Sequence, residues 1–223
     1  MLNELDDLLD SATIKPTFEY VHIILALYVF SNNPTGLGRY RLEKELAIGS
    51  GTAKSLINKL KKKINFIAVF KDNIRKGHVL TPKGNEFLNR CKNKIPFLVQ
   101  GDTSVLKDII IESENLSVYI CQVKSSADKI TNGMAQRDAA IKVNGKGASC
   151  IVYNGTEFVF ELGPSSEKDK EHMLVNKEVQ NYFKNIIIEA NSILEKNDVI
   201  ILGLGEKSEI ARLASLNAAL TLI

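Results

Sequence analysis

The chain has 223 residues, of which 44% are hydrophobic and 25% are charged. This length allows two domains of roughly 100 residues each, and the composition excludes a disordered chain. The longest apolar run is shorter than the roughly 20 residues that cross a bilayer, and the N-terminus is acidic where a signal peptide would be basic. We therefore expect a cytoplasmic protein that does not enter a membrane.

Charge is distributed unevenly along the chain. Residues 31–97 hold 15 lysines and arginines against 4 acidic residues, whereas residues 98–223 hold 13 against 17. A basic first half beside an acidic second half indicates that the first half meets a polyanion and the second does something else. We therefore predict two domains, residues 1–97 and residues 98–223.

The first half predicts helices followed by a hairpin. In chain order, the expected elements are an amphipathic arm over 2–9 that packs or contacts a second copy, a buried helix over 17–31, a short extended segment over 38–42, a brief helix over 42–46, a helix over 52–63, strands over 66–70 and 77–80 around a polar tip at 71–76, and a helix that begins at Pro82 after the cap Thr81 and reaches about Cys91. This order is typical of a winged helix-turn-helix.

Residues 49–55, Gly-Ser-Gly-Thr-Ala-Lys-Ser, look like a degenerate phosphate-binding loop of a nucleotide enzyme. Such a loop has the form G-x-x-x-x-G-K-[ST] and follows a buried strand. Here Ala53 stands where the glycine before the lysine should be, and the preceding segment is helical and charged. The nucleotide-loop interpretation therefore fails on both criteria.

The helix over 52–63 divides into two faces when residues are placed at about 100° intervals. The apolar stripe contains Ala53, Leu56, Ile57, Leu60 and Ile64. The opposite face contains Gly51, Ser55, Asn58 and Lys62, flanked by Lys54, Lys59 and Lys61. Small residues permit close approach, an asparagine can hydrogen-bond a base edge, and lysines can meet phosphate oxygens. Lysine-rich faces of isolated helices are commonly just solvated, but the preceding turn and the following hairpin favour DNA binding here.

A family resemblance supports this interpretation. The stretch GRYRLEKELAIGSGTAKSLINKLKK, with INFIAVF and GHVLTPKGNEFL after it, resembles the winged-helix domain of prokaryotic transcriptional regulators. Leu80-Thr81-Pro82-Lys83-Gly84 is similar to the L-T-x-x-G that closes their wing, and the resemblance covers residues 17–95. Residues 127–160 resemble the C-terminal domain of a family of archaeal winged-helix regulators, a domain without an established ligand.

These observations together predict a DNA-binding surface. The helix over 52–63 would enter the major groove of double-stranded DNA, and the basic wing over 71–77 would contact the backbone. Because one such helix reads only a few base pairs, we expect a homodimer on a two-fold-related site. The predicted DNA-binding residues are Arg39, Arg41, Ser50, Thr52, Lys54, Ser55, Asn58, Lys59, Lys62, Arg75 and Lys76.

The second half predicts an α+β sandwich with at least one antiparallel hairpin, turned by Asn154-Gly155. The expected elements are strands over 109–111 and 116–123, a helix from 127 to about 141, strands over 149–153 and 157–161, a helix from 165 to 190, a buried strand over 199–202 and an apolar helix over 206–222. Residues 210–223 are a candidate dimer face, because they are too apolar to leave in water.

Two features of the second half suggest a small-molecule effector site. Asn132, Arg137 and Asp138 match the N-G-x-x-Q-R-D-A-A stretch of the archaeal family, and an arginine beside a carboxylate can hold a polar or anionic molecule; an ion pair between elements is the alternative. Gly203 and Gly205 lie between the expected strand and helix, where backbone N–H groups can cradle an anion; a simple turn is the alternative.

Motifs of enzymes are otherwise missing. The three histidines, His22, His78 and His172, are isolated from one another and from the cysteines, and three widely spaced cysteines, Cys91, Cys121 and Cys150, indicate free thiols. We expect no cofactor, no metal and no catalytic residue, and we predict a transcriptional regulator whose C-terminal domain dimerises or senses an effector. The alternative is an enzyme that acts on a small metabolite through its C-terminal domain, with the winged helix as a docking module.

Overall fold

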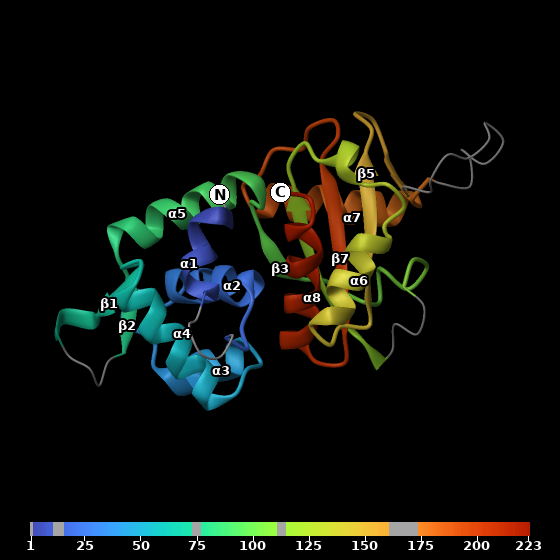
Figure 1. Cartoon of the computed structure of the whole chain (residues 1–223). Coiled ribbons are helices and arrows are strands. Elements are labelled where there is room, and N and C mark those ends of the chain that lie inside the picture. The colour runs from blue at the N-terminus through green and yellow to red at the C-terminus, as the bar shows by residue number, and fades with distance from the viewer. Residues whose placement is uncertain (1, 11–15, 73–76, 111–114, 161–173) are drawn as a thin grey trace. The chain divides into compact units, whose positions relative to one another are not determined.

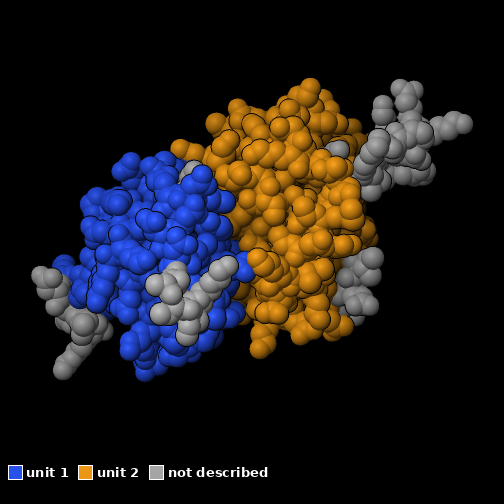
Figure 2. Space-filling model, viewed as in Figure 1, with its two compact units in different colours: residues 1–92 blue, residues 93–223 orange. Residues whose placement is uncertain are grey.

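The computed structural model describes residues 2–10, 16–72, 77–110, 115–160 and 174–223. The chain divides into two compact units, Met1–Lys92 and Asn93–Ile223, which Figure 2 distinguishes by colour. This boundary lies within a helix. It comes earlier in the chain than the domain boundary after Phe97 that the charge distribution predicts. We refer to residues 1–92 as the first unit and to residues 93–223 as the second unit.

The first unit contains short helices and a two-stranded antiparallel sheet (Figure 1). In chain order, its elements are a 3₁₀ turn Leu2–Leu5, α1 Asp6–Leu9, α2 Tyr20–Ser31, α3 Arg39–Glu45, α4 Ser50–Lys62, β1 Ile67–Val69, β2 His78–Leu80 and α5 Pro82–Lys94. The strands pair with Ile67 opposite Leu80. Thr81 caps α5 as predicted, since its hydroxyl accepts a hydrogen bond from the Gly84 N–H at 3.1 Å.

Residues 38–42 are not an extended segment, which corrects the sequence interpretation. Gly38 is extended, but it is the N-cap of α3, and the helix begins at Arg39. The extended pairing occurs one residue earlier, where the Leu37 N–H donates to the His78 carbonyl at 2.9 Å and the His78 N–H donates back to Leu37. A bridge of one residue leaves no alternating pattern in the sequence, so periodicity could not reveal it.

Helix α2 forms the centre of the first unit, because apolar side chains occur on nearly all its sides. Its N-terminus is closed by a capping box, in which the Glu19 side chain accepts from the His22 backbone and the Glu19 N–H donates to His22 Nδ1 at 3.1 Å. Burial lowers the pKa of His22, with Glu19 opposing the effect. The neutral imidazole can therefore accept this bond at neutral pH, which gives His22 a structural role.

The second unit is built on a five-stranded antiparallel sheet with the order β3-β4-β7-β5-β6. The strands are β3 Leu98–Gln100, β4 Ser117–Val123, β5 Gly147–Tyr153, β6 Phe158–Phe160 and β7 Val199–Gly205. The predicted hairpin is confirmed, since β5 and β6 pair across residues 154–157. The prediction of a strand over 109–111 is wrong for Ile109 and Ile110, which lie outside any strand. Strand β3 forms the edge of the sheet beside β4 instead.

Helices cover both faces of this sheet, and the mixed α+β class is as predicted (Figure 1). Helix α7, Lys177–Glu189, packs against one face through Val179, Phe183 and Ile187. Helices α6, Met134–Lys142, and α8, Ser208–Leu220, pack on the other. The helix predicted from residue 127 is divided, because Gly133 has φ 73° and separates α6 from a 3₁₀ turn, Ala127–Lys129.

Helix α8 lies so close to β7 that only glycine fits between them. A Cβ on Gly203 would lie 2.0 Å from the Ser215 nitrogen, and one on Gly205 would lie 2.6 Å from the Ala211 nitrogen. The apolar side chains of α8 are used by this packing, and Leu213, Leu216 and Leu222 are buried within the single chain. The expectation that residues 210–223 offer an apolar dimer face is therefore wrong.

We predict that Gly203→Ala destabilises the protein by about 3 kcal/mol or more, because the added methyl must displace the α8 backbone. Gly51→Ala is the matched control: φ is ordinary there and no atom lies within 4 Å of the added Cβ, so alanine should raise stability by up to about 1 kcal/mol. Urea unfolding of both variants measures the two effects. Equal stability of the two variants would contradict the close approach of α8 to β7.

Candidate nucleic-acid interface

Helix α4 has the division into two faces that its sequence predicts. Ala53, Leu56 and Leu60 are fully buried and Ile57 is nearly so. Each buried leucine or isoleucine side chain contributes about 1.5–3 kcal/mol of hydrophobic stabilisation, which holds the helix against the body of the first unit. The helix therefore presents a fixed set of residues to solvent.

The exposed face of α4 combines small, polar and basic residues. We call this set the open face; it consists of Gly51, Lys54, Ser55, Asn58, Lys61 and Lys62. At Gly49, Gly51 and Gly38, φ is not positive and an added Cβ would meet no atom within 4 Å. The fold therefore does not require glycine at these positions, and the surface beside the N-terminus of α4 is open to close approach.

Thr52 and Lys59 do not belong to the open face, although both were predicted to contact DNA. The Thr52 hydroxyl shares a hydrogen bond of 2.6 Å with the Thr17 hydroxyl. Lys59 Nζ donates to the Leu8 carbonyl at 2.6 Å and to the Asp10 carbonyl at 3.2 Å, and its ammonium lies over the Phe18 ring. Lys59 thereby attaches residues 2–10, which we call the N-terminal segment, to one side of α4.

Lys63 completes this attachment by donating to the Asp7 carbonyl at 3.0 Å. The last carbonyls of a helix lack intrahelical partners and carry partial negative charge, so two ammonium groups are suitable ligands for the end of α1. Burial lowers the pKa of Lys59, Lys63 lowers it further, and Asp10 opposes both. These contacts join residues about 50 positions apart, so no local pattern in the sequence could predict them.

The remaining predicted DNA contacts are distributed around α3 and α4. Ser50 begins α4 and is exposed. On α3, the Arg39 guanidinium lies over the Tyr40 ring at 4.8 Å, and Arg41 pairs with Glu45 at 3.8 Å across one helical turn. Both arginines keep contact with solvent. Arg75 and Lys76, the predicted wing contacts, lie outside the described residues.

In the second unit, the predicted effector residues are only partly brought together. A cavity of about 230 Å³ is lined by Asn132, Arg137 and the edge of β5, including Ser149 and Cys150. Asn132 Oδ1 accepts from the Met134 N–H at 3.1 Å. Asp138 does not line this cavity and pairs with its neighbour Arg137 at 2.9 Å on the exposed surface of α6.

Gly203 and Gly205 lie elsewhere and do not form a strand-to-helix turn. Strand β7 continues to Gly205, so Gly203 is opposite Tyr119 on β4 and Ala148 on β5. The expectation of an anion-binding turn is corrected: the strand is longer than its apolar run suggests, because glycine is needed where α8 covers it. These glycines serve packing in the structure.

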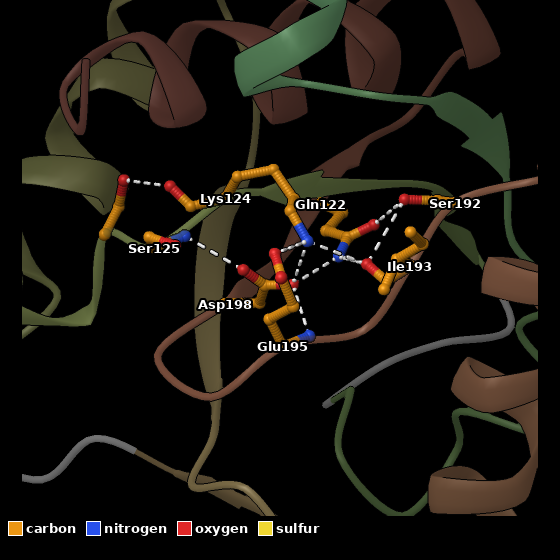
Figure 3. A network of polar contacts seen from close by, with 8 residues as sticks. Gln122, Lys124, Ser125, Ser192, Ile193, Glu195 and Asp198 are labelled. Atoms are coloured by element: carbon orange, nitrogen blue, oxygen red, sulfur yellow. Dashed lines mark hydrogen bonds and ion pairs between the residues drawn. The ribbon is translucent and has the colours of Figure 1, made fainter.

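A buried polar network that the sequence analysis missed lies at the other end of β7 (Figure 3). The carboxylate of Asp198, which has no exposed surface, accepts hydrogen bonds from Gln122 Nε2, Lys124 Nζ and the backbone N–H groups of Ser125 and Glu195, at 2.6–2.9 Å. Gln122 also donates to the Ile193 carbonyl and accepts from the Ser192 hydroxyl. A fully satisfied network of this kind fixes the loop before β7 to β4.

Lys124 supplies the charge that balances this site. Burial disfavours its ammonium, but hydrogen bonds to Glu195 at 2.8 Å and to Asp198 at 2.9 Å outweigh burial and raise the pKa of Lys124. The only sequence signal was the presence of Gln122 and Asp198 in or beside apolar strands. Polar residues at such positions are buried only when they are paired.

Cysteine and metal chemistry find no support among the described residues. The three cysteines are thiols outside any disulfide, as predicted, and all three are buried. Burial raises the pKa of Cys91 and of Cys121 to about 12. These two thiols stay protonated at neutral pH and are poor nucleophiles. Within the described ranges, no three His, Cys, Asp or Glu residues gather as metal ligands, and none of the helices there is long and apolar enough to span a bilayer.

The fold is shared with an archaeal protein. A solved structure described as "Hypothetical protein PH0730 from Pyrococcus horikoshii OT3" superposes with a TM-score of 0.63 and 22% sequence identity, covering 92% of this chain and 93% of that chain. Residues 115–222, which extend from the start of β4 through α8, match a family described as "Domain of unknown function (DUF4443)". No curated protein matches the sequence.

We predict that Lys59→Ala lowers the stability of the protein by about 1–2 kcal/mol, because it removes the charged donor from two carbonyls of the N-terminal segment. Lys62→Ala, on the open face of the same helix, should change stability by less than about 0.5 kcal/mol. Chemical unfolding measures both. A Lys59→Ala variant as stable as Lys62→Ala would show that Lys59 does not anchor this segment.

We also predict that Asp198→Ala destabilises the protein by about 3–5 kcal/mol, because Lys124 and Gln122 lose a buried acceptor. Asp138→Ala removes an ion pair whose side chains are 54% and 65% exposed and should cost less than about 0.5 kcal/mol. Thermal unfolding of the two variants tests the comparison. A small effect at Asp198 would contradict the structural role of the network.

Proposed function

We propose that the protein is a DNA-binding transcriptional regulator. The observation that carries the proposal is the open face of α4: three lysines and an asparagine beside unobstructed glycines, on a helix whose other faces are used within the first unit. Lysines can neutralise phosphates, Asn58 can hydrogen-bond the edge of a base, and the glycines allow close approach of a nucleic-acid backbone.

The elements around α4 support a winged helix-turn-helix arrangement. Helices α3 and α4 are joined by residues 46–49, and the antiparallel hairpin of β1 and β2 follows. In this proposal α4 enters the major groove, and Arg39 and Arg41 on α3 lie near the DNA backbone. Residues 71–77 would act as the wing, with Arg75 and Lys76 at its tip.

The second unit would supply dimer contacts or sense an effector. A homodimer would place two copies of α4 on a two-fold-related DNA site. The cavity beside Asn132 and Arg137 is the proposed place for a small polar effector, since a guanidinium there can bind an anionic group. Arg137 also pairs with Asp138 at 2.9 Å on the exposed surface of α6.

The test measures binding of the full-length protein to a fluorescent 30-base-pair duplex of random sequence across a range of salt concentrations. We expect measurable binding at low salt and an affinity that falls steeply as salt rises, because bound lysines release condensed counterions. Lys54→Ala with Lys62→Ala should reduce the slope of log affinity against log salt by about 2.

The control replaces two exposed lysines of the second unit, Lys107→Ala with Lys196→Ala, which makes the same change in net charge. This variant should bind DNA as the unchanged protein does. Absence of binding at low salt, or equal losses in both double variants, would contradict the proposal. Turnover of a small metabolite that is lost in Arg137→Ala would favour the enzyme alternative instead.

A further inference from the structure

The N-terminal segment brings an acidic surface to the side of α4 that carries Thr52, Lys59 and Lys63. Leu5 and Leu8 are fully buried, and the two lysines bind the carbonyls of Asp7, Leu8 and Asp10. The segment is therefore an integral part of the first unit. A ligand that approaches α4 at Lys59 and Lys63 therefore meets residues of the N-terminal segment there.

The four acidic side chains of this segment fall into two pairs. Glu4 forms an ion pair with Arg90 at 2.5 Å, and Asp6 accepts a hydrogen bond from the Tyr20 hydroxyl, so these two serve the fold. Asp7 and Asp10 are exposed. Among the described residues, no hydrogen bond or ion pair engages their carboxylates, although Asp10 acts electrostatically on Lys59.

The two sides of α4 consequently differ in charge. On the side of the N-terminal segment, the ammonium groups of Lys59 and Lys63 are balanced by the carboxylates of Asp7 and Asp10. The open face has Lys54, Lys61 and Lys62, and no acidic residue lies on α4 itself. The field around the helix is therefore positive on one side and close to neutral, with outward-facing carboxylates, on the other.

We propose that Asp7 and Asp10 form an electrostatic screen that excludes phosphates from one side of α4 and confines the nucleic-acid backbone to the other. The inference rests on the DNA-binding function proposed above. The two carboxylates cancel the attraction that Lys59 and Lys63 would otherwise exert on phosphates, and charge complementarity of this kind sets docking orientation. The screen acts over about 10 Å at 0.1 M salt, which is comparable to the diameter of a helix with its side chains.

This arrangement assigns different roles to lysines that the sequence does not distinguish. Lys59 and Lys63 are positioning residues, because they hold the screen in place through backbone carbonyls. Lys54, Lys61 and Lys62 are the residues that would meet phosphates. A duplex is then bound in one orientation relative to α4, which is a requirement for reading an asymmetric half-site.

The test uses the full-length protein and the same fluorescent 30-base-pair duplex. Asp7→Asn with Asp10→Asn removes both charges and keeps the side-chain size. We expect this variant to bind DNA about 3- to 10-fold more tightly than the unchanged protein at about 20 mM salt, and the difference to vanish near 0.5 M salt. Thermal unfolding of each variant verifies that the first unit remains folded.

The control is Asp128→Asn with Glu189→Gln, which makes the same change in net charge at exposed positions of the second unit and should alter the affinity by less than about 2-fold. Binding by the unchanged protein with equal gains in both double variants, or with no gain in Asp7→Asn/Asp10→Asn, overturns the screen and leaves the proposed function standing. Absence of binding by every variant overturns the proposed function and the screen together.

Discussion

Helix α4 is held in the first unit from two directions. Its apolar stripe is buried in the first unit, and the ammonium groups of Lys59 and Lys63 are bound to the end of α1. With these two sides occupied, α4 offers an external partner Ser50 and the residues of the open face. The polarity of that face follows from packing, because a helix seated in this way cannot rotate without exposing Leu56 and Leu60.

The second unit is organised by a different constraint, the close contact between a central strand and a helix. Strand β7 has glycine where α8 approaches and large aliphatic residues, such as Ile200 and Leu202, where the core beneath α7 must be filled. At its beginning, Asp198 fixes the preceding loop through four hydrogen bonds (Figure 3). Both features stabilise the sheet, and the cavity beside α6 is where we propose that an effector binds.

The sequence predicted those features that depend on local periodicity and turn chemistry. The stripe of α4, the Thr81 cap and the Asn154-Gly155 hairpin all depend on neighbouring residues, and the structure contains each of them. It could not predict features that depend on distant partners. The sequence does not distinguish Lys59 from Lys62, because the difference is the contact of Lys59 with the end of α1. It likewise predicts a turn at Gly203, because the close approach of α8 that requires glycine there involves a distant segment.

The most direct test of the central claim is an NMR titration of the isotope-labelled full-length protein with a short DNA duplex at low salt. Backbone amide signals of Gly51, Ser55 and Asn58 should shift progressively with added duplex, while those of Leu8 and Lys59 should move little. Shifts that are largest at Leu8 and Lys59, or that are confined to the second unit, would contradict the account.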